Sequence, residues 1–101
     1  MAITKQINIT AHDGKASELH AMLTNVARLS AEESGCLYYF AWQQSSEDNF
    51  IIIESWVDQD SLDAHKKTAH FLEFKENLSL LVKDKSSENL TFMAGTSLDK
   101  S

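Results

Sequence analysis

The 101-residue sequence contains no proline, only three glycines and a single cysteine. The lone Cys36 excludes a disulfide within the chain, and its place in an apolar stretch favours a small buried side chain over a reactive thiol. The glycine-rich phosphate-binding motifs of nucleotide-dependent enzymes are absent. The sequence also has no linker or low-complexity segment, so residues 1–95 are interpreted as one domain and residues 96–101 as a loose C-terminal tail.

Basic residues are scarce as well. Nine Lys and Arg against fifteen Asp and Glu give a formal net charge of -6, and the basic residues are scattered. Such a surface repels phosphate backbones and anionic membranes, so neither nucleic acid nor a membrane is an expected partner. No apolar run approaches the ~20 residues that span a bilayer. The start MAITKQINIT lacks the basic flank and apolar core of a signal peptide, and a cytoplasmic protein is expected.

The first half of the chain shows two kinds of periodicity. Strict alternation over residues 3–11 (ITKQINITA) predicts a strand. Helical spacing of apolar residues, with Asp13 as the N-cap and Gly35 as the stop, predicts a helix over about residues 14–33. Aromatic and β-branched residues at 36–44 and 49–57, separated by SSED, predict a hairpin.

The second half predicts a helical region and one more strand. Residues 60–82 have a helical composition with a break near Thr68, and ENLTFMA at 88–94 is typical of a strand. The resulting β-α-β-β-α-β order is that of the ferredoxin-like α+β fold, a four-stranded antiparallel sheet with its helices on one face.

The hairpin strands are apolar on both of their faces. Residues 36–42 have no polar break except the tyrosine hydroxyls, and Phe50 is followed by three isoleucines. The helices can cover only one face of the sheet, and a second copy of the chain is the simplest cover for the other. A homodimer is therefore expected.

The stretch NFIIIESWVDQDSLDAHKKTAHF (49–71) resembles the antibiotic biosynthesis monooxygenase (ABM) family. That family shows an apolar strand ending in Glu-x-aromatic, followed by Leu-x-x-His and Thr-Pro-His-Phe. The matching residues are Glu54, Trp56, Leu62, His65, Thr68, His70 and Phe71. GCLYY at 35–39 resembles the opening of the family's second strand, so the likeness covers about residues 3–94. Ala69 stands where the family usually has proline.

The resemblance implies a dimeric α+β barrel with a pocket in each subunit between sheet and helices. ABM members include cofactor-independent monooxygenases that oxidise quinols or aromatic polyketides. The resemblance therefore implies a monooxygenase acting with dioxygen on a small quinol or aromatic substrate, with no cofactor. Another branch degrades haem with a histidine ligand about ten residues beyond the position of His65; Lys75 lies in that region here, so haem is not expected.

His65 and His70 are the candidate acid–base residues. Residues five apart on one helix are turned by about 500°, which leaves them ~140° from facing each other. The i, i+4 spacing of zinc-binding helices is absent, so no metal site is expected. His65 is expected to point inward and to act as a general base, or else to be a core histidine bonded to a backbone carbonyl. His70 is expected to tie its helix to the strand-to-helix connection, or to contact the substrate.

Trp56 and Glu54 should share one face of their strand. A buried tryptophan can form the wall of a flat pocket and donate its N–H to a substrate oxygen, or it can simply be a core residue. Glu54 is expected to be paired and structural.

The resemblance implies a role for Asn8, because in the oxygenating members an asparagine on the first strand, together with a tryptophan, helps to hold the substrate's oxygens, and Asn8 is similar in place. The expected catalytic set is therefore His65, Asn8 and Trp56, and the expected substrate-binding set is Trp56, Tyr39, Phe71 and His70. The face on which Tyr39 lies stays open. Two other functions also stay open: an isomerase that moves protons in a small ketone, as in the autoinducer-processing branch, and a non-catalytic dimeric ligand-binding module.

Overall fold

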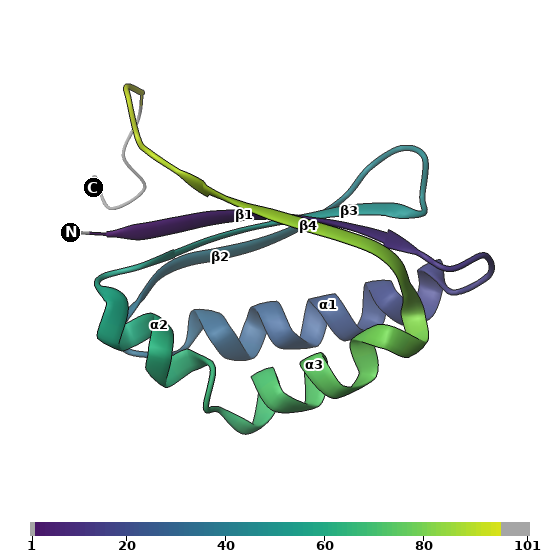
Figure 1. Ribbon diagram of the computed structural model, residues 1–101, viewed down its shortest axis with the longest axis horizontal. Coiled ribbons are helices and arrows are strands. Elements are labelled where there is room, and N and C mark those ends of the chain that lie inside the picture. Colours follow the sequence, from purple (N-terminus) through teal and green to yellow (C-terminus); the bar gives the residue numbers. More distant parts are fainter. Residues whose placement is uncertain (1, 96–101) are drawn as a thin grey trace.

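A computed structural model describes residues 2–95 and shows one four-stranded sheet with helices on one side (Figure 1). The elements in chain order are β1 (Ile3–Ala11), α1 (Ala16–Ala31), β2 (Cys36–Gln43), β3 (Asn49–Trp56), α2 (Gln59–His65), α3 (Ala69–Leu81) and β4 (Val82–Leu90). This is the ferredoxin-like α+β fold expected from the sequence. The predicted C-terminal tail, residues 96–101, lies outside the described residues.

The strands lie in the order β2-β3-β1-β4, and every neighbouring pair is antiparallel. Ile9 pairs with Phe50 and Ile7 with Ile52, so these side chains point to the same face. Ile9, Phe50 and Ile52 are buried, which identifies this face as the one covered by the helices. The core on this side is completed by residues from the helices: Leu19, Leu23, Val26, Leu62, Phe74 and Leu81.

The face away from the helices is the uncovered face of the sheet in Figure 1. We define the open face by the side chains of Tyr38, Phe40, Trp42, Ile51 and Ile53, which the strand register places there. The rings of Tyr38 and Phe40 stack with centroids 5.5 Å apart, and Trp42 lies 6.2 Å from Phe40. Phe40 and Trp42 are exposed, so an apolar surface remains in the single chain.

The helical region breaks where the sequence predicted. The Asp58 side chain accepts from the backbone N–H of Ser61 at 2.8 Å and begins α2. The Thr68 hydroxyl accepts from the N–H of Phe71 at 3.2 Å and begins α3. Both are side-chain N-caps, which stabilise the first turn by satisfying free backbone donors. The short connection of residues 66–68 therefore turns the chain between two helices.

Three predictions about the ends of elements are wrong. The last strand covers Val82–Leu90, whereas the sequence predicted 88–94. Its residues are mostly polar and exposed, and β4 lies at an edge of the sheet, where it pairs only with β1. At the start of α1 the N-cap is Lys15, with no side-chain cap bond, because Gly14 adopts a positive φ of 78° and separates Asp13 from the helix. The same helix ends at Ala31, four residues before Gly35.

Within residues 2–95, no helix has both the length and the apolar character needed to cross a membrane.

Candidate active site

Glu33 lies in the tight turn that joins α1 to β2. Its N–H donates to the carbonyl of Ser30, and its carbonyl accepts from the N–H of Cys36 at 3.0 Å. The turn is fixed against the start of α2, because the Gly35 carbonyl accepts from the N–H of Val57 at 2.9 Å. These contacts direct the Glu33 side chain toward the junction of α2 and α3.

One oxygen of Glu33 joins the two histidines. Its Oε2 lies 2.7 Å from Nδ1 of His65 and 2.8 Å from Nε2 of His70. His65 is the last residue of α2 and is 1% exposed, whereas His70 lies in the first turn of α3 and is partly exposed. Three segments of the chain thus meet at one carboxylate. We call Glu33, His65 and His70 the histidine cluster.

The expectation that His65 and His70 face apart is therefore wrong. That argument assumed one regular helix through both residues, but the chain leaves the helix between them. Their ring centroids lie 5.9 Å apart. The inward position predicted for His65 is found. His70 does tie down its helix, although its partner is the turn between α1 and β2 and not the connection after β3.

The contacts to Glu33 restrict the protonation of both rings. A carboxylate only accepts hydrogen bonds, so His65 must carry its proton on Nδ1 and His70 on Nε2. The remaining nitrogen of His65, Nε2, then has a free lone pair. Among residues 2–95 no hydrogen bond to this nitrogen is found. A carboxylate that orients an imidazole in this way is the arrangement that prepares a histidine for general-base catalysis.

Aromatic side chains enclose the His65 ring. The Trp56 ring lies 4.4 Å away between centroids at an angle of 32°, and Phe71 presents an edge at 5.0 Å. Tyr39 lies 5.9 Å from the same ring. Tyr39 faces the helices, which answers the question that the sequence left open. The structure thus brings together five of the six predicted site residues: His65, Trp56, Tyr39, Phe71 and His70.

Trp56 has a different hydrogen-bond partner from the one expected. Its indole N–H donates to Oε1 of Glu54 at 2.9 Å, so it is not free for a substrate oxygen. Glu54 is buried and paired, as expected for a structural carboxylate. Burial raises the pKa of the Tyr39 hydroxyl, and the charge of Glu54 with its hydrogen bond to Tyr39 raises it further. Tyr39 therefore stays protonated at neutral pH and acts as a donor, not as a base.

Asn8 is separated from this group by the sheet. It pairs with Ile51 in register, and its neighbours Ile7 and Ile9 point to the helices, so Asn8 points to the open face. There it accepts from Gln6 at 3.2 Å and donates to Ser86 at 3.4 Å. The expectation that Asn8 shares one pocket with His65 and Trp56 is corrected: within one chain they lie on opposite faces.

Cys36 lies close to the carboxylates of Glu33 and Glu54. Burial, with the charges of Glu33 and Glu54, raises the pKa of its thiol to about 11. Since the thiolate is the reactive form, this agrees with the structural role expected for Cys36.

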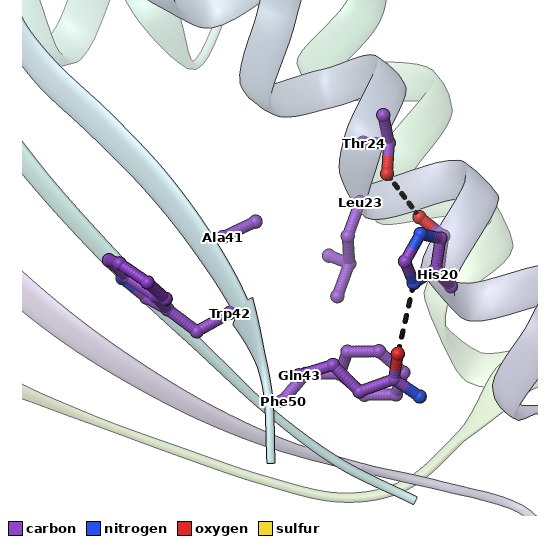
Figure 2. Close-up of a pocket in the computed structure, with 7 residues that line it drawn as sticks. All are labelled: His20, Leu23, Thr24, Ala41, Trp42, Gln43 and Phe50. Atoms are coloured by element: carbon purple, nitrogen blue, oxygen red, sulfur yellow. Dashed lines mark hydrogen bonds between the residues drawn. The ribbon is translucent and has the colours of Figure 1, made fainter. Parts of the chain in front are cut away.

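A small hollow lies at the other end of the hairpin from Trp56 (Figure 2). Its volume is about 40 Å³, and at its edge Nδ1 of His20 donates to Oε1 of Gln43 at 3.1 Å. It is lined by His20, Leu23, Thr24, Ala41, Trp42, Gln43 and Phe50. Ligand pockets for small organic molecules are commonly about 300–1,000 Å³, so this hollow holds water at most.

Glu33 is the site residue that the sequence did not single out. It stands in EESG, an acidic turn of ordinary composition, 32 residues before His65. Its position two residues before GCLYY, the stretch that resembles the opening of the family's second strand, is the only signal that could have indicated it.

Comparison with known proteins identifies relatives over most of the chain. The family model described as antibiotic biosynthesis monooxygenase matches residues 2–77. An uncharacterized protein of Synechocystis is 34% identical over 70 residues, which cover 68% of this chain and 48% of that protein. The chain therefore spans about half the length of this curated relative.

Solved structures share the whole fold. A crystal structure of a Pseudomonas aeruginosa protein has a TM-score of 0.87 at 32% identity and covers 92% of this chain and 95% of its own. A Bacteroides thetaiotaomicron protein of unknown function, described as a possible oxidoreductase, has a TM-score of 0.82 at 25% identity and covers 90% of this chain and 97% of its own.

Proposed function

The chain belongs to the antibiotic biosynthesis monooxygenase family, and on this basis we propose that it is a cofactor-independent monooxygenase that oxidises a small quinol or related aromatic with dioxygen. The observation that supports this reaction is the histidine cluster. It holds a buried imidazole in one tautomer, with its second nitrogen free and aromatic rings around it. A dry site with an oriented base suits the deprotonation of a phenol.

The proposed reaction begins when Nε2 of His65 takes a proton from a quinol hydroxyl. The electron-rich anion then reacts directly with dioxygen at a ring carbon. One oxygen atom stays on the ring and the other leaves as water, so a quinol and dioxygen give a hydroxyquinone and water. The quinol supplies all four electrons that dioxygen accepts. Glu33 stabilises the imidazolium of His65 through the 2.7 Å contact.

Substrate has to reach a ring that is enclosed in this structure. His65 lies directly before the three-residue connection between α2 and α3, and Phe71 lies after it in the first turn of α3 and is only partly buried. In the proposal, movement of this connection opens the ring to substrate, and Trp56 remains the opposite wall. Asn8 has no part in this site within one chain.

We also propose that the protein acts as a homodimer formed through the open face. Phe40 and Trp42 are exposed there, and the segment after β4 rises on the same side of the sheet in Figure 1. That segment carries Phe92 and Met93, which are strongly exposed in the single chain. Apolar surface of this extent is typical of an interface, and a second copy offers the same surface in return.

Oxygen uptake with a series of quinols tests the proposed reaction. His65→Ala should lower the turnover rate by about 10²–10⁴-fold, which is the usual contribution of a general base. Glu33→Gln should also lower it, because a neutral partner stabilises the imidazolium less. His70→Ala is the matched control, since its ring contacts the same oxygen, while among residues 2–95 the ring pairs with Trp56 and Tyr39 are found for His65 and not for His70.

Each variant is checked for an unchanged thermal midpoint before its rate is compared. Equal rates in wild type, His65→Ala and His70→Ala, or a loss confined to His70→Ala, would contradict the role of His65. If no quinol or related aromatic supports oxygen uptake, the oxygenase proposal fails.

A further inference from the structure

The histidine cluster has the composition of a metal site as well as that of a catalytic base. Glu33, His65 and His70 each offer one ligand atom, a carboxylate oxygen or a ring nitrogen, and these three atoms all lie within 4.8 Å of one another. From this geometry we infer that the cluster binds a divalent transition metal of the zinc class. The binding inference stands on the three side chains alone and does not depend on the proposed reaction.

The ligand types select the class of metal. Two imidazole nitrogens and one carboxylate suit zinc, cobalt, nickel or iron(II), whereas magnesium and calcium prefer oxygen ligands throughout. Three protein ligands leave the fourth position to water. The net charge of -6 favours the approach of a cation.

The distances are close to those that an ion would require. Zinc binds nitrogen and oxygen at about 2.0–2.2 Å, which separates neighbouring ligand atoms in a tetrahedral site by ~3.3 Å. The two oxygen-to-nitrogen distances are now 2.7 and 2.8 Å, and the cluster offers one ligand atom per side chain with no pair more than 4.8 Å apart. On metal binding the two oxygen-to-nitrogen distances would lengthen by about 0.5 Å, and the widest pair would shorten by at most ~1.5 Å.

The surroundings fix one ligand and leave access to the others. His65 is buried against Trp56 and Phe71, so its ring is held in place. The side chains of Glu33 and His70 are 15% and 16% exposed, and they form the side from which an ion can enter. His70 lies in the first turn of α3, close to the connection, and is the more exposed of the two histidines.

Metal binding would prevent His65 from acting as the proposed general base. An ion on Nδ1 of His65 requires a lone pair there, so the single proton of the neutral ring moves to Nε2. Nε2 is then a donor and cannot take a proton from a phenol. This consequence rests on the proposed function: if that function is right, zinc inhibits oxygen uptake by competing with a proton and not with the quinol.

The test uses untagged protein freed of metal with a chelator. Zinc is titrated by calorimetry, and cobalt is titrated by its visible absorption, which reports the coordination geometry. Wild type should bind one ion per chain. His70→Ala and Glu33→Gln should each weaken binding by roughly 100-fold or more, since even outer-shell partners of a metal contribute about 10–100-fold.

His20→Ala is the control, because His20 lies on α1 and bonds Gln43, away from the cluster. It should bind like wild type. The thermal midpoint of wild type and His20→Ala should rise with zinc concentration, and that of His70→Ala should not. The inference is wrong if wild type shows no saturable binding, if binding survives in both cluster variants with unchanged affinity, or if His20→Ala abolishes it.

Failure of this inference can be told apart from failure of the proposed reaction. The metal titrations contain no quinol, and oxygen uptake is measured with a chelator present. A protein that binds zinc but never consumes oxygen supports the metal site alone. A protein that consumes oxygen but binds no zinc supports the base alone.

Discussion

Gly35 and Ser61 lie so close together that a methyl group on Gly35 would overlap the Cβ and Oγ atoms of Ser61. The turn after α1 is therefore in direct contact with the first turn of α2. Because Glu33 belongs to the same turn, this contact also sets the position of the carboxylate that joins His65 and His70.

Gly35→Ala is expected to destabilise the protein by about 1–3 kcal/mol, the usual cost of forcing an extra methyl group into a packed site. Chemical denaturation at fixed protein concentration measures the loss. Ser61→Gly in the same chain should recover part of it, because it removes the overlapping Cβ. Ser61→Ala should recover little, because the Cβ remains. Equal stability of Gly35→Ala and wild type would contradict the close contact.

Trp56→Ala is expected to lower the free energy of unfolding by about 3–5 kcal/mol, as for other buried aromatic residues. Trp56 is fully buried, and its N–H donates a hydrogen bond to the buried carboxylate of Glu54. Leu80→Ala, at a position 69% exposed on α3, is the control and should change stability by less than ~0.5 kcal/mol. A Trp56→Ala protein of nearly wild-type stability would contradict this contribution of Trp56 to the core.

Ala69→Pro is expected to stabilise the protein by about 0.4–1 kcal/mol. Ala69 is the first residue of α3, where proline is favoured because the position needs no helical hydrogen bond. Thr68 already has φ -71° and ψ 153°, which is the conformation that a residue before proline prefers. Thermal unfolding should show a higher midpoint.

The control for this substitution is Ala64→Pro, inside α2, which should cost roughly 3 kcal/mol. A decrease in the midpoint with Ala69→Pro would mean that the start of α3 differs from the one described.

Wild-type protein is expected to have about twice the 11.4 kDa chain mass in light scattering, since the open face is apolar. Trp42→Lys should shift the mass toward that of a monomer, because it places a charge in the proposed interface. Leu72→Lys is a matched control: Leu72 is 52% exposed on α3, against 58% for Trp42. A monodisperse wild-type monomer, or dissociation by Leu72→Lys as well, would rule out this interface.

The sequence by itself determined most of the fold. Alternation of apolar residues predicted Ile3–Ala11 as a strand, and the β-branched and aromatic run predicted the hairpin, because each signal is local to its own segment. The break near Thr68 was also predicted from the sequence. A side-chain N-cap depends only on the capping residue and the helical turn that follows it. The strand at Val82–Leu90 was missed because VKDKSSENL carries no strand signal of its own, and only pairing with β1 makes it a strand.

The site was decided by tertiary structure. The sequence indicated His65 and His70 as candidate residues, but the prediction that they face apart assumed one helix. The turn of the chain between α2 and α3 brings both rings to the same oxygen of Glu33. Glu33 has no local signal, because its role depends on contacts with residues 32 and 37 positions away. Asn8 was placed with His65 by resemblance, yet strand alternation puts it on the opposite face. Periodicity fixes which element a residue belongs to, whereas the packing of one element on another fixes which side chains meet.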